Sequence, residues 1–197
     1  MKYLIWRVVH ALVFVVILTG TFVSLTTAPW FTQGKEDTYW KGTLLSPMEG
    51  NVYSEEKNYY ELSKDYQGGA QDMFENLYIG GVMYITLASL GCLFLILTIV
   101  FLVFQKYTQA KLMLSAVIAS WAGFLLLVFA YFSWVTLAKV EFGECQNLSE
   151  KTQEPVCAHA GSVLALVLIC VYFVSLLMNC WLWRSVKTNE ARQQTRV

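Results

Sequence analysis

The chain has 197 residues and a formal net charge of zero, and 56% of its residues are hydrophobic. Only 14% are charged, and the basic residues form no patch large enough to cover phosphates, which excludes a nucleic-acid-binding role. Because the apolar excess is gathered into long runs, the composition indicates a membrane protein rather than one or two soluble domains.

Four runs free of Asp, Glu, Lys and Arg predict four membrane-spanning helices. Their lengths are 21, 29, 27 and 25 residues. At about 1.5 Å per residue, each can cross a hydrocarbon core about 30 Å thick. We therefore expect an all-α membrane protein, a four-helix bundle forming a single domain over residues 1–197. The runs cover residues 8–28, 77–105, 112–138 and 159–183.

The segments between these runs carry net charges of opposite sign. The N-terminus, the 106–111 turn and the tail 184–197 together have a net charge of +7, whereas loops 29–76 and 139–158 have −7. Lys and Arg favour cytoplasmic loops, so we expect both termini inside and both acidic loops outside. We expect the plasma membrane to hold the protein, with an endomembrane as the alternative, and the basic segments to face anionic lipid headgroups.

The first apolar run begins like a secretory signal, because Lys2 and Arg7 precede it. It continues several residues past the hydrophobic region of an ordinary signal, so we predict a retained first helix. His10 is interpreted as an interfacial polar residue of this helix. His10 and His159 lie at opposite membrane faces, so they cannot share a metal ion or a haem.

The first outer loop, residues 29–76, is too long to be a bare connection. Residues 38–40 and 51–53 have strand-like composition, and residues 55–66 read as a short amphipathic or irregular stretch. We expect a small, β-containing extracellular cap. Its tryptophans, Trp30 and Trp40, are predicted to shape an outer recognition surface.

Small residues recur every four positions in the third and fourth runs. They are Ser115, Ala119 and Gly123 in the third run, and Gly161 and Ala165 in the fourth. Flat helix faces of this kind let backbones approach closely where lipid offers no hydrophobic force between helices. Packing within the bundle is the simpler interpretation, and contact with a neighbouring subunit is the alternative.

The loop 139–158 contains the two cysteines that are expected outside, Cys145 and Cys157. An oxidising compartment favours a disulfide between them, worth about 3 kcal/mol by loop closure. Asn147 begins an Asn-Leu-Ser glycosylation acceptor, although its closeness to the third run would hinder glycan transfer. Cys180, at the inner end of the fourth run, is a candidate for palmitoylation.

We predict no catalytic residue, metal site or cofactor, and therefore no enzyme. Proton relays, coupled transport and intramembrane proteolysis depend on ionisable groups inside the bilayer. The four runs contain no Asp, Glu, Lys or Arg.

The topology resembles that of the claudin-like four-span clan, which includes claudins, peripheral myelin protein relatives, calcium-channel gamma subunits and amastins. In the third run, Lys111-Leu112-Met113-Leu114, Ala122-Gly123-Phe124-Leu125 and Ser133-Trp134 are similar to the claudin pattern. The start of the fourth, Ala160-Gly161-Ser162-Val163-Leu164, is similar to amastin fourth spans. Unlike claudins, the first outer loop contains no cysteine.

The resemblance implies a non-enzymatic tetraspan protein that acts by lateral or intercellular association through its outer loops, in a claudin-like adhesive or structural role. One alternative is an accessory transmembrane subunit of a larger channel, receptor or energy-converting complex. Another is a channel or lipid-handling protein. The expected partners are the lipid bilayer and other membrane proteins, in a homo-oligomer or a hetero-complex.

Overall fold

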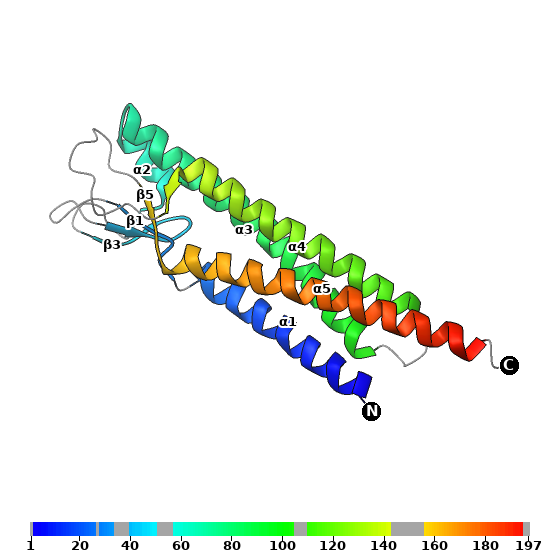
Figure 1. The fold of residues 1–197 in the computed structure, drawn as a ribbon. Helices are drawn as coiled ribbons and strands as arrows, with labels where there is room; N and C mark the ends of the chain where they lie inside the picture. Colours follow the sequence, from blue (N-terminus) through cyan, green and yellow to red (C-terminus); the bar gives the residue numbers. More distant parts are fainter. Residues whose placement is uncertain are drawn as a thin grey trace. The chain divides into compact units, whose positions relative to one another are not determined.

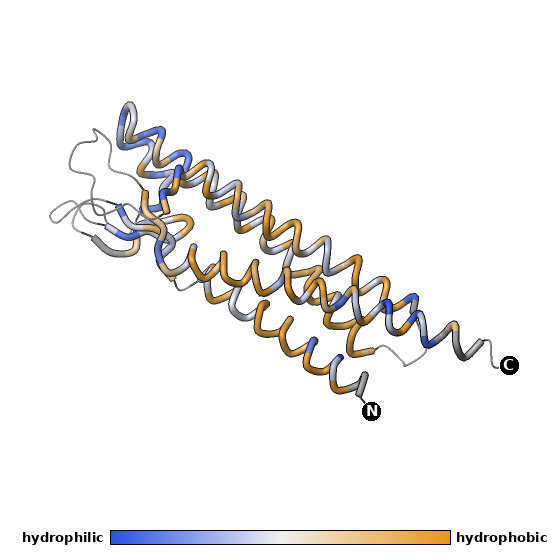
Figure 2. The backbone as a smooth tube through the Cα atoms, in the orientation of Figure 1, coloured by the Kyte–Doolittle hydropathy of each residue, from blue (hydrophilic) through white to orange (hydrophobic). Residues whose placement is uncertain are grey.

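A computed structural model describes most of the chain, and within the described residues four long helices are apolar enough to cross a membrane (Figures 1 and 2). They are α1 (Lys2–Thr26), α3 (Gly69–Phe104), α4 (Ala110–Ala138) and α5 (Ala160–Gln194). A short helix, α2 (Tyr59–Asp65), and a small sheet accompany them. The predicted all-α membrane fold with a β-containing element is confirmed. The described residues are 2–26, 28–33, 40–50, 57–104, 110–142 and 156–194.

The helices do not end where the charge-free runs end. α1 stops at Thr26, two residues before the predicted boundary, whereas α3 already begins at Gly69 and α5 continues to Gln194. A charged residue ends a hydropathy run, but it does not end a helix, because Glu, Lys and Arg are good helix formers. The predicted spans were therefore placed correctly and were too short at the starts of α1, α3 and α4 and at the end of α5.

The sheet joins strands from the segment between α1 and α3 with strands from the segment between α4 and α5. Its order is β3-β2-β1-β5-β4, with antiparallel pairs except for the parallel pair β4–β5. The predicted strand at 38–40 is observed in part, because β2 begins at Trp40, and residues 51–53 lie outside the described part of the chain. The sequence did not predict β4 and β5. The strands are β1 (Phe31–Gln33), β2 (Trp40–Gly42), β3 (Pro47–Gly50), β4 (Val140–Glu141) and β5 (Val156–Ala158).

The chain divides into two compact units, and every long helix contributes to both. Unit 1 comprises residues 1–21, 88–128 and 167–197, and unit 2 comprises residues 22–87 and 129–166. This division follows the charge. Unit 1 has eight Lys and Arg residues and one acidic residue, whereas unit 2 has six Lys residues and thirteen acidic ones.

The buried side chains of α1 form a stripe with alternating spacings of three and four residues. That spacing keeps one face of a helix against its neighbours. Side chains between the stripe positions, such as Leu12, Val16 and Phe22, are exposed and apolar. The inward face of α1 is thus more polar than its outward face, as expected of a helix surrounded by lipid. The stripe consists of Arg7, His10, Phe14, Ile17, Thr21 and Ser24.

Candidate functional site

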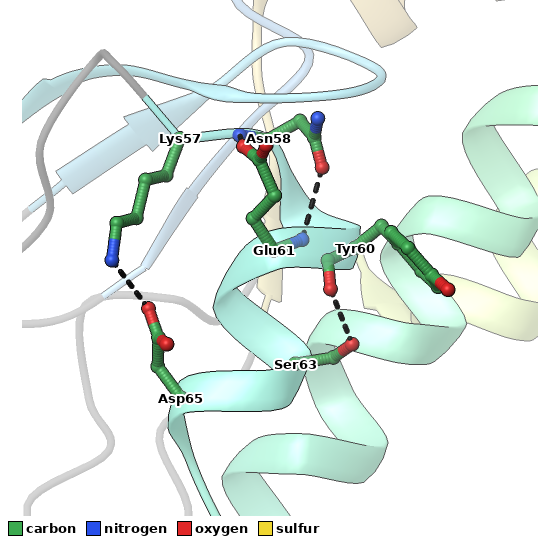
Figure 3. A network of polar contacts seen from close by, with 6 residues as sticks. All are labelled: Lys57, Asn58, Tyr60, Glu61, Ser63 and Asp65. Atoms are coloured by element: carbon green, nitrogen blue, oxygen red, sulfur yellow. Dashed lines mark hydrogen bonds and ion pairs between the residues drawn. The ribbon is translucent and has the colours of Figure 1, made fainter.

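Helix α2, in unit 2, is fixed at both ends by polar contacts (Figure 3). At its start, the Asn58 side-chain oxygen accepts a hydrogen bond from the backbone N–H of Glu61. The Glu61 carboxylate in turn accepts one from the backbone N–H of Asn58, and both bonds are 3.0 Å long. This reciprocal pair is a capping box, which satisfies amide groups that a helix start otherwise leaves without partners. Lys57 forms an ion pair with Asp65 at 2.6 Å, and this hydrogen bond and charge raise the pKa of Lys57.

Tyr59 anchors α2 to the rest of unit 2. Its ring is fully buried and stacks on Phe74, with centroids 6.2 Å apart. Its hydroxyl donates to the Ser46 carbonyl at 2.7 Å and to the Thr43 carbonyl at 3.1 Å. A Cβ atom on Gly42 would collide with this hydroxyl, so a glycine is needed there. Burial raises the pKa of Tyr59 well above its ordinary value.

The opposite side of α2 presents an aromatic and cationic patch, which we call the α2 surface and define as Tyr60, Lys64 and Tyr78. Tyr60 is 48% exposed, and the Lys64 ammonium lies 4.0 Å from the centroid of its ring. The Tyr78 ring, from α3, lies 5.4 Å from that of Tyr60. Tyrosine is enriched among the residues that dominate protein–protein binding energy. No pattern in the sequence predicted this patch.

Trp30 lies in the core of unit 2. It is fully buried, its ring is 4.4 Å from that of Tyr84 and 4.8 Å from that of Trp134, and its indole N–H donates to the Ser24 carbonyl. A Cβ atom on Gly161 would approach the indole ring to 2.8 Å. Trp30 therefore touches α1, α3, α4 and α5, and the predicted small residue Gly161 makes room for it.

Trp40 is also a core residue, with 2% of its surface exposed. Its ring packs against Phe31, with centroids 5.0 Å apart, and against Phe74, at 6.1 Å. Large rings gain more free energy from burial than from remaining in water, so both predicted recognition tryptophans shape the cap from within. A partner could touch the exposed residues around them, but not Trp30 or Trp40 themselves.

Gly123 on α4 sits at a close approach of helices within unit 1. A Cβ atom there would lie 3.1 Å from the Gly91 carbonyl of α3 and 2.7 Å from the Tyr172 hydroxyl of α5. Only a residue without a side chain permits these two contacts. This is the intramolecular packing that the small-residue pattern favoured.

The other predicted packing residues differ in their burial. Ala119 and Ala165 are buried, at 7% and 3% exposure, whereas Ser115 is half-buried. The Ser115 hydroxyl donates to the Lys111 carbonyl of its own helix. The predicted face of α4 thus packs most tightly at Ala119 and Gly123.

A buried polar cluster in unit 1 was missed by the sequence analysis. Arg7 is 8% exposed, and its guanidinium donates to the Leu102 carbonyl near the end of α3. His10 is 2% exposed, and its Nε2 lies 2.9 Å from the Ser175 carbonyl oxygen of α5. His10 is therefore buried against α5, and its place at the membrane interface stays a prediction. The last carbonyls of a helix lack partners within it and carry negative partial charge, which offsets the cost of burying Arg7.

The cluster continues along α5. The Asn179 amide donates to the Ser120 hydroxyl of α4 at 3.2 Å. The Asn179 Oδ1 and the Tyr172 hydroxyl are buried without a hydrogen-bond partner. Tyr172, Ser175 and Asn179 follow one another at spacings of three and four residues, a polar stripe that was visible in the sequence. Among the described residues, no group of three His, Cys, Asp or Glu side chains could hold a metal ion.

The modification sites stay predictions. Cys145 and Asn147 lie outside the described residues, so neither the Cys145–Cys157 bridge nor the glycosylation acceptor is described. Cys157 is buried in β5, opposite Thr32 of β1. Cys180 is half-buried. The described cysteines with free thiols are Cys92, Cys170 and Cys180.

Comparison with protein-family models and with curated proteins finds no match. The claudin-like resemblance therefore rests on the sequence features alone and stays a prediction.

Proposed function

We propose that the chain is a non-enzymatic four-span membrane protein that acts by lateral or intercellular association. Its contact region is the cap, by which we mean the five strands, α2 and the residues 43–46 of unit 2. The observation that carries the proposal is the α2 surface, in which the exposed Tyr60 ring has a cation over it and the half-buried Tyr78 ring beside it.

The construction of α2 favours a contact role. A seven-residue helix is marginal in water by itself, because helix nucleation is costly. Here the capping box, the Lys57–Asp65 ion pair and the buried Tyr59 ring hold it in place. Such preorganisation lowers the ordering cost that a flexible loop would incur on binding a partner.

The proposed orientation places both termini in the cytoplasm and the cap outside, in the plasma membrane. The unequal charges of the two units support it, because basic residues favour the cytoplasmic side and all four arginines fall in unit 1. External protease should leave a C-terminal tag intact in sealed right-side-out vesicles. Cleavage of that tag would reverse the orientation and remove the cap from the extracellular space.

The association itself is tested by the double substitution Tyr60→Ala and Lys64→Ala. We expect this variant to keep its thermal stability and to lose self-sized species in blue-native electrophoresis and in cell-surface cross-linking. Phe142→Ala is the matched control, because Phe142 is 50% exposed in unit 2 and lies outside the α2 surface. The control should associate normally.

Two outcomes would count against the proposal. Unchanged association of the double variant would mean that the rings only anchor α2 at the level of the lipid headgroups, where tyrosine is also enriched. A single large hetero-complex in place of self-sized species would favour the accessory-subunit alternative.

A further inference from the structure

Unit 1 has a strongly basic character that its own fold does not explain. It contains eight Lys and Arg residues and one acidic residue, Glu190. Among the side chains that the structure describes, three of these cations are exposed: Lys111 on α4, and Arg184 and Lys187 on α5. Neither ion pairs among the described side chains nor the helix dipole accounts for their positions.

Arg184 and Lys187 have no ion-pair partner among the described side chains. The Lys187 ammonium lies over the Trp183 ring, 5.5 Å from its centroid. Cations near a helix C-terminus can be stabilised by the helix dipole, but this effect is confined to the last turn. Because α5 continues to Gln194, both residues lie more than one turn before its end.

Lys111 is the second residue of α4, where the helix start carries positive partial charge. A cation there is disfavoured by the helix itself. No carboxylate among the described side chains pairs with any of these three exposed cations, which points to an anion outside the protein.

The α5 face that contains Arg184 is amphipathic along the helix axis, with apolar side chains followed by a cation. Leu177, Trp181 and Arg184 follow one another at spacings of four and three residues, so they share one face of the helix. Leu177 is 52% exposed, Trp181 is 57% exposed, and Arg184 is exposed. Along α5 this face passes from aliphatic to aromatic to cationic, as a phospholipid passes from acyl chain to headgroup.

We propose that this face of α5, with Lys187 and Lys111, binds anionic phospholipid headgroups of the bilayer. A lipid fits better than a soluble anion, because the exposed Leu177 and Trp181 adjoin the cations and would lie against the acyl chain and the interface. The proposal concerns unit 1 and is independent of association through the cap.

Native mass spectrometry of the purified full chain tests it, with phosphatidylserine and phosphatidylcholine offered at equal concentration. The unmodified protein should retain phosphatidylserine preferentially, and less so as salt is raised. Each cation near an anionic surface contributes about fivefold, so Arg184→Gln with Lys187→Gln should reduce the preference by roughly thirtyfold. Arg184→Lys, which keeps the charge, should retain most of it.

The control is Lys139→Gln, which removes an exposed lysine from unit 2 outside the α2 surface. The control should keep the preference, and the thermal stability of the double variant and of the control should equal that of the unmodified protein. Equal retention of the two lipids by the unmodified protein would overturn the proposal. So would an equal loss in the control, or complete displacement of phosphatidylserine by millimolar inorganic phosphate, which would assign the site to a soluble anion.

Discussion

The same four long helices pass through units 1 and 2, but the side chains that pack them differ between the two units. In unit 1, polar bonds to carbonyl groups, such as those of Arg7 and His10, and the close approach at Gly123 accompany a ring cluster of Phe14, Phe124 and Tyr172. In unit 2, large rings around Trp30 and Trp40 fill the interior, beside a sheet and a short helix. Helices in lipid gain no hydrophobic free energy by associating, so shape and polar bonds must specify their partners. Rings are buried in both units, and in unit 2 the two buried tryptophans, Trp30 and Trp40, add to this burial.

The largest expected effect is that of Trp30→Ala in unit 2. Truncating a fully buried tryptophan costs about 3–5 kcal/mol of unfolding free energy. We expect a large fall in the thermal midpoint, with amide hydrogen exchange accelerated in unit 2 rather than in unit 1. Trp6→Ala, at a position 46% exposed, is the control and should have little effect. Equal acceleration in both units would mean that they do not unfold separately.

Replacing both Cys145 and Cys157 by Ser should have the next largest effect. If the predicted disulfide forms, its loss should destabilise the cap by about 3 kcal/mol and leave membrane insertion intact. Mass spectrometry of the loop peptide before reduction should show the loss of ~2 Da that disulfide formation causes. Two free thiols, or a covalent dimer through these residues, would refute the intramolecular bridge.

Ala119→Leu tests the packing of unit 1. The larger side chain would press against the neighbouring helices and should cost about 1–3 kcal/mol. The matched control is Ser89→Leu, which adds bulk at an exposed position of α3 in the same unit. We expect the isolated monomer of the Ala119 variant to lose thermal stability. A stable monomer that fails to assemble would identify a neighbouring subunit as the partner of this face.

Tyr59→Phe should cost about 1 kcal/mol, because two carbonyl groups lose a hydroxyl donor. The pH dependence follows from the raised pKa of Tyr59. The neutral hydroxyl stabilises the fold fully below the unfolded pKa of about 10, and this contribution is lost as pH rises through the folded value. Alkaline unfolding of unit 2, followed by tyrosine absorbance, should therefore be less steep in the Phe variant. An unchanged alkaline profile would assign the transition to another group.

The smallest effect is expected for Asn179→Leu. Hydrogen bonds between helices in membranes contribute about 0.6 kcal/mol on average. The substitution also removes the buried Oδ1 atom that has no partner. We expect a change in unfolding free energy below about 1 kcal/mol. A loss as large as that of the Ala119 variant would show that polar bonds, rather than shape, dominate unit 1.

The four helices could be predicted from the sequence because hydrocarbon admits only apolar segments that satisfy their own backbone. Helix α2 was also within reach, because Asn58 followed by Glu61 is a capping-box signature. The burial of Arg7 could not be predicted, since a charge in lipid is unfavourable until a carbonyl from a distant helix, here Leu102, is known to lie beside it. Trp30 and Trp40 were correctly predicted to shape the cap, but they lie in its interior and not on its surface. Composition alone does not show which side chains of a loop are buried.

The central position of β1 in the sheet links the cap to the order in which the chain is synthesised. Its partner β2 follows it directly, but its other partner, β5, is made only after α3 and α4 have been completed. Pairing between such distant segments is slow, and until it occurs one edge of β1 is open to other strands. The sheet can therefore close only after α4, the third long helix, and the β5 strand that precedes α5 have been synthesised.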